Sequence, residues 1–402
     1  MNIIVPATSF PRTGDDAAGR FVFDLSRGLA ELGHRLVHIV PKPSQPSDDR
    51  LLLPDGIEVR EVPVGLGNWG GALAYGAGIG PNITKSPWLG VAVPSLMRSL
   101  KAGISAALNE EPNSSILSHW VFPSGLIAAE IAQRKGAHHV SVAHGGGLQA
   151  LLRSRLTKSW LTGWAEGTNA AVFVSEDLKN KAIRALGDQM PENHIVQPMG
   201  IDARSFMPCG ESDEIPSNSE KGEPGLTLLG VGRLIELKGF DLLIRAAAEF
   251  DHARVIICGD GPEKSTLANL AKSLAVPCQF LGQLSPRRLG AQYRAADLLI
   301  IPSRLGKKGR SEGSPMVVLE AMSQGLPFVG SKTGGLPSLA SDSGAGRTFV
   351  VNKSHDLVRA IRDLTVEDCW QETMREEALR FAAKHQYSVM AKAVEGLLLL
   401  GE

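Results

Sequence analysis

Two glutamates eight positions apart, Glu312 and Glu320, are side chains that could bind a polar ligand. A helix is predicted over Met316 to Gln324, so that Glu312 can reach over its N-terminus and Glu320 leans back toward that end. Free backbone N–H groups between two carboxylates suit a ligand with phosphate at one end and hydroxyl groups at the other. The alternative is that Glu312 only complements the helix dipole and Glu320 is a solvated helix residue.

A pair of basic residues, Arg233 and Lys238, follows an apolar run at Leu226 to Val231 that predicts a buried strand. Both side chains then lie between the end of that strand and the start of a helix predicted over Phe240 to Ala248. An arginine offers a planar fork of donors and a lysine a compact charge, so the pair suits a diphosphate.

Two histidines, His119 and His144, each follow a predicted strand, at Ser115 to Ser118 and at Val140 to Ala143. The carboxyl ends of parallel strands form the ligand edge of an open sheet, which predicts a site role for both. The alternative is a structural role, since a lone histidine is more often structural. We expect His138 and His139, which precede the second strand, to lie at the surface.

Strand and helix patterns alternate along both halves of the chain, which predicts a parallel sheet in each half. The first such unit has strands at Asn2 to Val5 and Leu36 to Val40, with a helix at Arg20 to Leu32 between them. A polar segment over 209–224 is typical of a link between domains. The chain is therefore expected to have an α/β fold with two domains.

Two segments allow two interpretations each. Residues 65–90 hold eight glycines and three aromatic residues, and we expect no regular element there. This segment is either an Ω-like loop that meets an acceptor or lipid head groups, or a poorly packed connection. The pattern of Leu151 to Ala165 predicts one amphipathic helix with Trp160 and Lys158 on opposite sides. That helix either lies on an anionic membrane surface or faces the core with solvated charges.

Composition excludes several classes of protein. The 402 residues include 42 basic and 42 acidic ones without a basic tail, so nothing indicates a nucleic-acid partner. Four dispersed cysteines and the lack of a clear DxD or His/Asp cluster predict neither disulfides nor a metal site. The N-terminus is a short strand rather than a signal peptide, and no apolar run reaches the roughly 18–20 residues of a membrane span. We expect a cytoplasmic protein.

The segment Glu312-Gly-Ser-Pro-x4-Glu320 resembles the E-x7-E motif of retaining glycosyltransferases of family 4, which have the GT-B fold. Other segments resemble this family's GRL…KG, GxGP, HxW…PxG, HG and NGVD…F motifs, and the resemblance covers nearly the whole chain. The first loop departs from the family pattern, because Gly14-Asp15-Asp16 and Gly19 replace the usual pair of adjacent glycines.

The resemblance implies two Rossmann-like domains that face a central cleft, one in residues 1–200 for the acceptor and one in 201–385 for a nucleotide sugar. It also implies that a final helix, in residues 386–402, crosses back to the N-terminal domain. The expected catalytic residues are His144, Arg233, Lys238 and Glu312. The expected donor-binding residues are Gly232, Gly261, Pro262, Gly282, Gly313, Ser314, Pro315, Val317, Val318 and Glu320. The expected acceptor-side residues are Gly14, Asp16, Gly19 and His119.

The implied reaction transfers a hexose-type sugar from a nucleotide-diphosphate sugar, with UDP or GDP as the nucleotide, to a hydroxyl group. The anomeric configuration of the sugar is retained. The acceptor would be a saccharide or a lipid-linked compound in bacterial cell-surface polysaccharide or glycolipid synthesis. The nucleotide sugar is a co-substrate, and no metal or other cofactor is expected. A peripheral contact with the cytoplasmic face of the inner membrane follows if the segment 151–165 lies on it. The alternatives are a sugar-nucleotide 2-epimerase of the same fold, a phosphorylase with a pyridoxal lysine, and a non-catalytic carbohydrate- or nucleotide-binding module.

Overall fold

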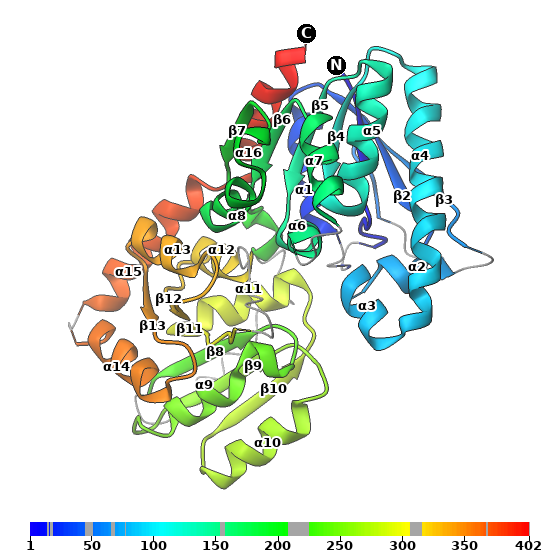
Figure 1. Ribbon diagram of the computed structural model, residues 1–402. Helices are drawn as coiled ribbons and strands as arrows, with labels where there is room; N and C mark the ends of the chain where they lie inside the picture. Colours follow the sequence, from blue (N-terminus) through cyan, green and yellow to red (C-terminus); the bar gives the residue numbers. More distant parts are fainter. Residues whose placement is uncertain are drawn as a thin grey trace. The chain divides into compact units, whose positions relative to one another are not determined.

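The computed structural model describes residues 1–13, 16, 19–44, 51–65, 69–76, 78–152, 157–207, 225–305, 316–366 and 369–401. The chain forms two compact units (Figure 1). Unit 1 comprises Met1–Gly200 and Tyr387–Glu402, and unit 2 comprises Ile201–Gln386. Each unit has its own parallel sheet and is described by itself. The expected α/β fold with two parallel-sheet domains is confirmed.

Unit 1 has a seven-stranded sheet in the order β3-β2-β1-β4-β5-β6-β7, with every neighbouring pair parallel. Its strands are β1 (Asn2–Pro6), β2 (Arg35–Pro41), β3 (Ile57–Val62), β4 (Ser115–His119), β5 (His139–Ala143), β6 (Ala170–Phe173) and β7 (Asn193–Val196). The central strands are buried almost throughout because helices cover both faces, which explains their apolar sequences.

The helices of unit 1 lie on both sides of that sheet. They are α1 (Arg20–Glu31), α2 (Trp69–Ala74), α3 (Ile79–Lys85), α4 (Val93–Glu110), α5 (Leu126–Lys135), α6 (Gly145–Leu152), α7 (Lys158–Glu166), α8 (Glu176–Leu186) and α16 (Tyr387–Leu398). The 3₁₀ helix η1 (Pro87–Ala92) joins α3 to α4, and η2 (Val121–Gly125) joins β4 to α5. Helices α4 and α5 share one core cluster with Ile4, Ile39 and Ile116 of the sheet.

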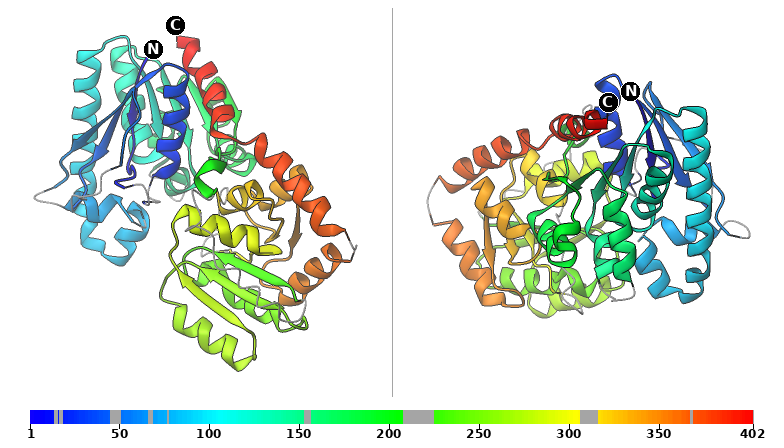
Figure 2. Two further views of the ribbon diagram at one scale, coloured as in Figure 1. Left: turned by 180° about the vertical axis from the view of Figure 1, so that it is seen from behind. Right: turned by 45° about the horizontal axis from the view of Figure 1, so that its top comes forward.

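The last helix, α16, packs against α1, so the C-terminal segment belongs to unit 1 (Figure 2). Gly28 makes the close approach possible, because a Cβ there would lie 2.9 Å from the Cβ of Ala391. His34, just after α1, lies with its Nε2 atom 2.7 Å from a carboxylate oxygen of Glu395. His138 Nε2 lies 2.9 Å from the carbonyl oxygen of Leu397, which ties the end of α16 to the sheet.

Unit 2 has a six-stranded parallel sheet in the order β10-β9-β8-β11-β12-β13. Its strands are β8 (Thr227–Val231), β9 (Arg254–Cys258), β10 (Cys278–Gly282), β11 (Leu298–Ile301), β12 (Phe328–Ser331) and β13 (Gly346–Phe349). Its helices are α9 (Phe240–Ala247), α10 (Lys264–Ser273), α11 (Pro286–Ala295), α12 (Met316–Ser323), α13 (Leu336–Ser343), α14 (Ser354–Leu364) and α15 (Trp370–Ala383). Alternate residues of the strands enter two core clusters, one with α9 and α14 and one with α12 and α15.

Two expectations about local structure were wrong. The segment 65–90 contains α2 and α3 and leads into η1, because Leu73 is fully buried and the Asn82 side chain donates to the carbonyl groups of Leu73 and Tyr75. The segment 151–165 is not one continuous helix, because α7 begins at Lys158 with Thr157 as its N-cap residue, and residues 153–156 lie outside the described residues. The glycines after His144 form the first turn of α6 rather than a loop.

The interior of unit 1 holds an unusual polar side chain, that of His38 in β2. It is fully buried beside Phe10, with ring centroids 4.5 Å apart, and neither ring nitrogen has a hydrogen-bond partner in the part of the chain that the structure describes. Burial lowers the pKa of His38 from 6.5 to about 3. Between those two pH values the unfolded chain binds a proton that the folded chain does not, so folded-state stability falls as the pH drops below 6.5.

We predict that His38→Leu removes part of this acid sensitivity. At pH 8 the variant should match or slightly exceed the parent in melting temperature, because two unsatisfied nitrogens are replaced by apolar atoms. At pH 5 it should be more stable by a further ~2 kcal/mol, since the proton no longer favours the unfolded chain. Thermal unfolding at both pH values, with His355→Leu at an exposed position as control, measures the difference. Equal shifts at the two pH values would contradict the prediction.

Candidate active site

Each sheet has a point where the strand order reverses beside its first strand. In unit 1 this point lies between β1 and β4, and in unit 2 between β8 and β11. The loops that leave the carboxyl ends of those two strands diverge, and open α/β sheets bind ligands in the crevice outside such a point. The loops after β1, β4, β8 and β11 carry most of the residues that the sequence marks as functional.

The two predicted site histidines are in direct contact in unit 1. His119 is the last residue of β4, and His144 follows β5, which pairs with β4 in parallel. His119 Nδ1 lies 3.1 Å from His144 Nε2, and the rings stack with centroids 5.4 Å apart. The Nε2 atom of His119 is buried without a hydrogen-bond partner among the described residues. Sequence reasoning placed both residues at the ligand edge but did not predict their contact.

Burial keeps both imidazoles neutral. It lowers the pKa of His144 to about 3, and it lowers that of His119 well below 6.5, with the charges of His144 and His38 as smaller causes. A bond between two neutral rings needs one nitrogen to donate and the other to accept, which the 3.1 Å separation satisfies. At neutral pH the two imidazoles therefore offer uncharged hydrogen-bonding groups.

Aromatic side chains surround the histidine pair. The ring centroid of Phe21, on the first turn of α1, lies 4.7 Å from that of His144 and 5.3 Å from that of Trp120. Trp120 has a positive φ of 63°, which is unusual for a large side chain, and its backbone N–H donates to the carbonyl of Val142. Such backbone strain typically costs about 1–3 kcal/mol and is tolerated where the surrounding structure fixes it.

A buried polar network lies behind the pair and corrects the expectation that His139 is at the surface. His139 is fully buried in β5, and its Nδ1 atom donates to the carbonyl oxygen of Gly167 at 2.9 Å. Its Nε2 atom lies 2.8 Å from the hydroxyl of Ser118, which lies 3.0 Å from that of Ser141. The indole N–H of Trp164 donates to the same Ser141 hydroxyl at 3.0 Å. This network fixes β5 against β4 and thereby the positions of both site histidines.

Three of the predicted acceptor-side residues, Gly14, Asp16 and Gly19, lie in the sequence between β1 and α1. Gly19 begins α1 with a φ of 73°, and a Cβ at this position would meet the Ser9 carbonyl oxygen at 2.5 Å. Only glycine fits there, so Gly19 has a demonstrable structural role. The carboxylate of Asp16 accepts from the backbone and side chain of Arg12, with the shorter bond at 2.6 Å. Gly14 lies outside the described residues.

The predicted donor-binding glycines of unit 2 lie in loops that contact one another, and Gly261 is the most closely packed of those described. A Cβ on Gly261 would meet the Leu234 carbonyl oxygen at 2.4 Å, and one on Gly232 would lie 3.3 Å from the side chain of Lys238. The loop after β8 is joined to the loop after β9, because the backbone N–H of Leu234 donates to the carbonyl of Asp260. Gly282 accepts from the backbone N–H of Gly259, which continues the same layer of loops to β10. Pro262 is exposed beside Gly261.

The two predicted cations lie at the end of β8, next to the switch point of unit 2. Arg233 is exposed and Lys238 half-buried, in the 3₁₀ turn Glu236–Lys238 that precedes α9. Sequence reasoning missed Arg304, which follows β11. Its backbone N–H donates to the carbonyl of Leu237, and its guanidinium lies 2.5 Å from Asp241. The loops after β8 and β11 are thus in direct contact.

Of the two predicted carboxylates, only Glu320 lies within the described residues. It stands on the second turn of α12, and its carboxylate accepts a 2.8 Å hydrogen bond from the hydroxyl of Tyr293 on α11. Val317 is half-buried, whereas the Val318 side chain is fully buried in the core, which leaves its backbone as the part that could meet a ligand. Glu312, Gly313, Ser314 and Pro315 lie outside the described residues.

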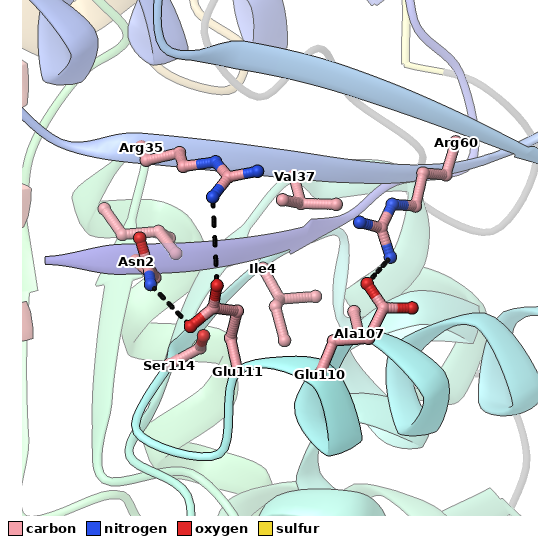
Figure 3. Close-up of a pocket in the computed structure, with 10 residues that line it drawn as sticks. Asn2, Ile4, Arg35, Val37, Arg60, Ala107, Glu110, Glu111 and Ser114 are labelled. Atoms are coloured by element: carbon pink, nitrogen blue, oxygen red, sulfur yellow. Dashed lines mark hydrogen bonds and ion pairs between the residues drawn. The ribbon is translucent and has the colours of Figure 1, made fainter.

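A small cavity of about 40 Å³ lies at the opposite, amino-terminal edge of the unit 1 sheet (Figure 3). Its charged side chains point toward one another rather than into open space, since Arg60 pairs with Glu110 at 2.7 Å and Arg35 with Glu111 at 3.8 Å. The volume is little more than that of one water molecule. This cavity is therefore separate from the candidate site.

Neither metal ligands nor membrane spans appear in the part of the chain that the structure describes. Within that part, no three His, Cys, Asp or Glu side chains are grouped so that they could hold a metal ion. None of the described helices combines the length and the apolar character that crossing a bilayer requires.

Two family models match the chain. Residues 18–205 match the model described as Glycosyltransferase Family 4, and residues 211–381 match the model described as Glycosyl transferases group 1. The first covers β4 and β5 with His119 and His144, and the second covers the switch point of unit 2 together with Arg233, Lys238 and Glu320.

Known proteins with similar sequence or structure agree with these matches. The D-inositol 3-phosphate glycosyltransferase of Corynebacterium aurimucosum is 31% identical over 52% of each chain, so the match spans about half the length of that relative. A sucrose-phosphate synthase from Thermosynechococcus elongatus superposes with a TM-score of 0.76 at 17% identity, over 99% of this chain and 98% of the other. Anabaena Alr3699/HepE in complex with UDP-glucose gives a TM-score of 0.69 at 17% identity, over 99% of both chains.

At this level of identity the structural likeness establishes the fold alone, and the family rests on the sequence models. Those models match one residue range in each unit, and together they leave only the two ends of the chain and 206–210 unmatched. The chain belongs to the glycosyltransferases of family 4, the group 1 glycosyltransferases with the GT-B fold.

Proposed function

We propose that the protein is a retaining hexosyltransferase that takes a hexose-type sugar from a nucleotide-diphosphate sugar and transfers it to a hydroxyl group of an acceptor. The observation that carries the proposal is the position of Arg233 and Lys238, which follow β8 at the switch point of unit 2. The relative solved with UDP-glucose supports a uridine nucleotide as the first donor to test. The reaction needs the nucleotide sugar as co-substrate, and we propose no metal or other cofactor.

The cations would act on the departing diphosphate. As the bond between the anomeric carbon and the phosphate oxygen breaks, negative charge grows on the β-phosphate. Cations fixed beside that oxygen stabilise the charge more in the transition state than in the ground state, which lowers the barrier. Arg233 can donate two parallel hydrogen bonds to a phosphate group, and Lys238 can place a compact positive charge beside it. Both suit a diphosphate. Backbone N–H groups at the start of α12 would add to the same effect.

The carboxylates would bind hydroxyl groups rather than act as a glycosidase acid/base pair. We propose that Glu320 accepts from the ribose hydroxyls and Glu312 from those of the sugar. Retention then follows if the acceptor hydroxyl attacks on the face from which the diphosphate leaves, and the departing phosphate oxygen takes the acceptor's proton. In this scheme no protein carboxylate forms a bond to the sugar, in contrast to retaining glycosidases.

The acceptor is proposed to meet the edge of unit 1 that carries His119 and His144. The neutral, buried His144 can exchange hydrogen bonds with sugar hydroxyls without introducing charge. The aromatic rings of Phe21 and Trp120 beside it can pack against the apolar face of a saccharide. A saccharide or lipid-linked compound in cell-surface polysaccharide or glycolipid synthesis is the acceptor class we propose.

Donor choice is tested most directly by thermal unfolding of the protein with UDP-, GDP- and ADP-glucose. A ligand that binds only the folded chain raises the melting temperature by mass action, and at one hundred times its dissociation constant it adds about 2.7 kcal/mol. One of the three nucleotide sugars should stabilise the protein, and UDP-glucose is expected to do so. The absence of any shift with all of them at millimolar concentration would overturn the proposed function.

We predict that Lys238→Ala lowers the rate of donor hydrolysis and of sugar transfer by about 10²–10³-fold, as does the loss of one preorganised charge-stabilising group. Glu320→Ala should lower kcat/KM for the donor in both reactions, because the ribose hydroxyls lose the group that accepts their hydrogen bonds. The matched control is Lys272→Ala, which removes an exposed lysine near the end of α10. The release of UDP from UDP-glucose, with and without acceptor, measures both rates. Near-parental turnover in either variant would refute the assignment of that residue.

Tyr293 offers a test of how Glu320 is held. We predict that Tyr293→Phe raises the KM for the donor about tenfold while kcat changes little, because the ribose-binding carboxylate loses the bond that orients it. Ser323→Ala is the control, since the Ser323 hydroxyl donates only to the backbone carbonyl of Glu320. Steady-state kinetics at saturating acceptor separate the two parameters. Equal KM values in Tyr293→Phe and the parent would show that the hydroxyl only serves stability.

A further inference from the structure

An exposed apolar surface lies where η1 passes into α4. Trp88 is 54% exposed and Val91 71% exposed, whereas Leu89 and Ala92 are buried. Side chains three positions apart in a 3₁₀ helix eclipse one another, so Trp88 and Val91 lie in one column on the outer side of η1. Exposed prolines precede and follow this column, Pro87 in η1 and Pro94 at the start of α4.

The part of the sequence that contains this column carries charge of one sign. The sequence has no acidic residue between Glu61 and Glu110, and its basic residues in that interval are Lys85, Arg98 and Lys101. Lys101 is paired with Glu130 at 2.8 Å. Lys85 is the last residue of α3, Arg98 lies on the second turn of α4, and both are exposed. We call Lys85, Pro87, Trp88, Val91, Pro94 and Arg98 the η1 surface.

The η1 surface is connected to the carboxyl edge of the unit 1 sheet. The hydroxyl of Tyr75, just after α2, donates to the carbonyl of Pro41 at the end of β2. The side chain of Asn82, in α3, donates to the backbone carbonyl of Tyr75. The backbone N–H of Ser86 donates to the backbone carbonyl of Asn82. These bonds hold α2, α3 and η1 as one lobe beside α4 (Figure 1). The lobe therefore stands on the side of unit 1 that carries His119 and His144.

We propose that the η1 surface docks on an anionic lipid surface. Exposed aromatic and aliphatic side chains enter the boundary between lipid head groups and acyl chains, while nearby cations bind the anionic head groups. A nucleic-acid partner would require a denser array of cations than Lys85 and Arg98 provide, and two adjacent apolar side chains at the centre would weaken it. The proposal deepens the proposed function, because a lipid-linked acceptor would be presented to the acceptor side of the same unit.

The segment 151–165, whose sequence pattern suggests membrane contact, exposes one large apolar side chain among its described residues, Trp160. Within that segment Trp160 is 46% exposed, but its ring stacks on that of Phe122, with centroids 5.9 Å apart and planes 12° apart. Leu161 and Trp164 of the same helix are buried in the protein. Trp160 therefore provides a matched control: a tryptophan of similar exposure, in the same unit, outside the η1 surface.

Sedimentation of the full chain with vesicles tests the proposal without donor or acceptor. The protein should bind vesicles of phosphatidylcholine with one-third phosphatidylglycerol and should not bind phosphatidylcholine alone. Trp88→Ala/Val91→Ala should reduce the partition coefficient at least about tenfold, from the loss of apolar burial. Lys85→Glu/Arg98→Glu should reduce it more than about 25-fold, since each cation near such a surface contributes about fivefold. Salt at about 1 M, where the Debye length is about 3 Å, should release the protein.

Trp160→Ala and Lys158→Glu should leave vesicle binding unchanged. The proposal is overturned if the parent protein binds neither kind of vesicle, if both kinds bind it equally, or if the Trp160 variant loses binding while the Trp88/Val91 variant keeps it. Melting temperatures of all variants show whether they fold. The shift caused by UDP-glucose in the same variants reports on the donor site, so failure of lipid docking is distinguishable from failure of the proposed transferase function.

Discussion

The structure depends on one constraint of parallel sheets, which is that all strands end at the same edge. When the strand order reverses beside the first strand, two loops leave that edge in opposite directions and a crevice forms outside it. Unit 1 places β1 and β4 at such a point, and unit 2 places β8 and β11 there. Residues far apart in sequence, such as His119 and His144 or Leu237 and Arg304, meet because the sheet imposes this geometry.

The two edges differ in their electrostatics, and the difference matches a division of chemical tasks. Unit 2 presents Arg233 and Lys238 beside glycines packed so tightly that a side chain would collide with neighbouring backbone. Close backbone approach together with positive charge suits a phosphate group. Unit 1 presents neutral imidazoles enclosed by aromatic rings, a setting that suits uncharged hydroxyl groups. A transferase needs both kinds of surface, since only one substrate carries the diphosphate.

The sequence predicted the strands and helices nearest the site, because long apolar runs bounded by glycines leave little freedom. It did not predict β3, α13 or β13, whose patterns are interrupted by charged or small residues, and it misjudged 65–90 on glycine content alone. It also missed α4, although Leu96, Leu100 and Ile104 recur there every four positions, as in an amphipathic helix. The site histidines were found from their place after strands. The residues that fix the site side chains in place were not found from the sequence. Tyr293 and Ser118 contact Glu320 and His139 only through tertiary packing. His139 appeared to precede its strand, and pairing with Ile116 extends the strand to include it.

Unsatisfied polar atoms mark the same edges in another way. Among the described residues, the buried side-chain atoms without a hydrogen-bond partner in the protein belong to His38, His119, Ser303 and Arg304. Each such group costs about 1–3 kcal/mol, so a chain selected for stability alone would replace them. His119, Ser303 and Arg304 stand at or just beyond the carboxyl ends of β4 and β11, the strands at the two switch points. Buried polar groups without partners are expected at functional sites, where local stability rules are violated. Their position at these strand ends therefore agrees with a ligand site there, as the proposed transferase function requires.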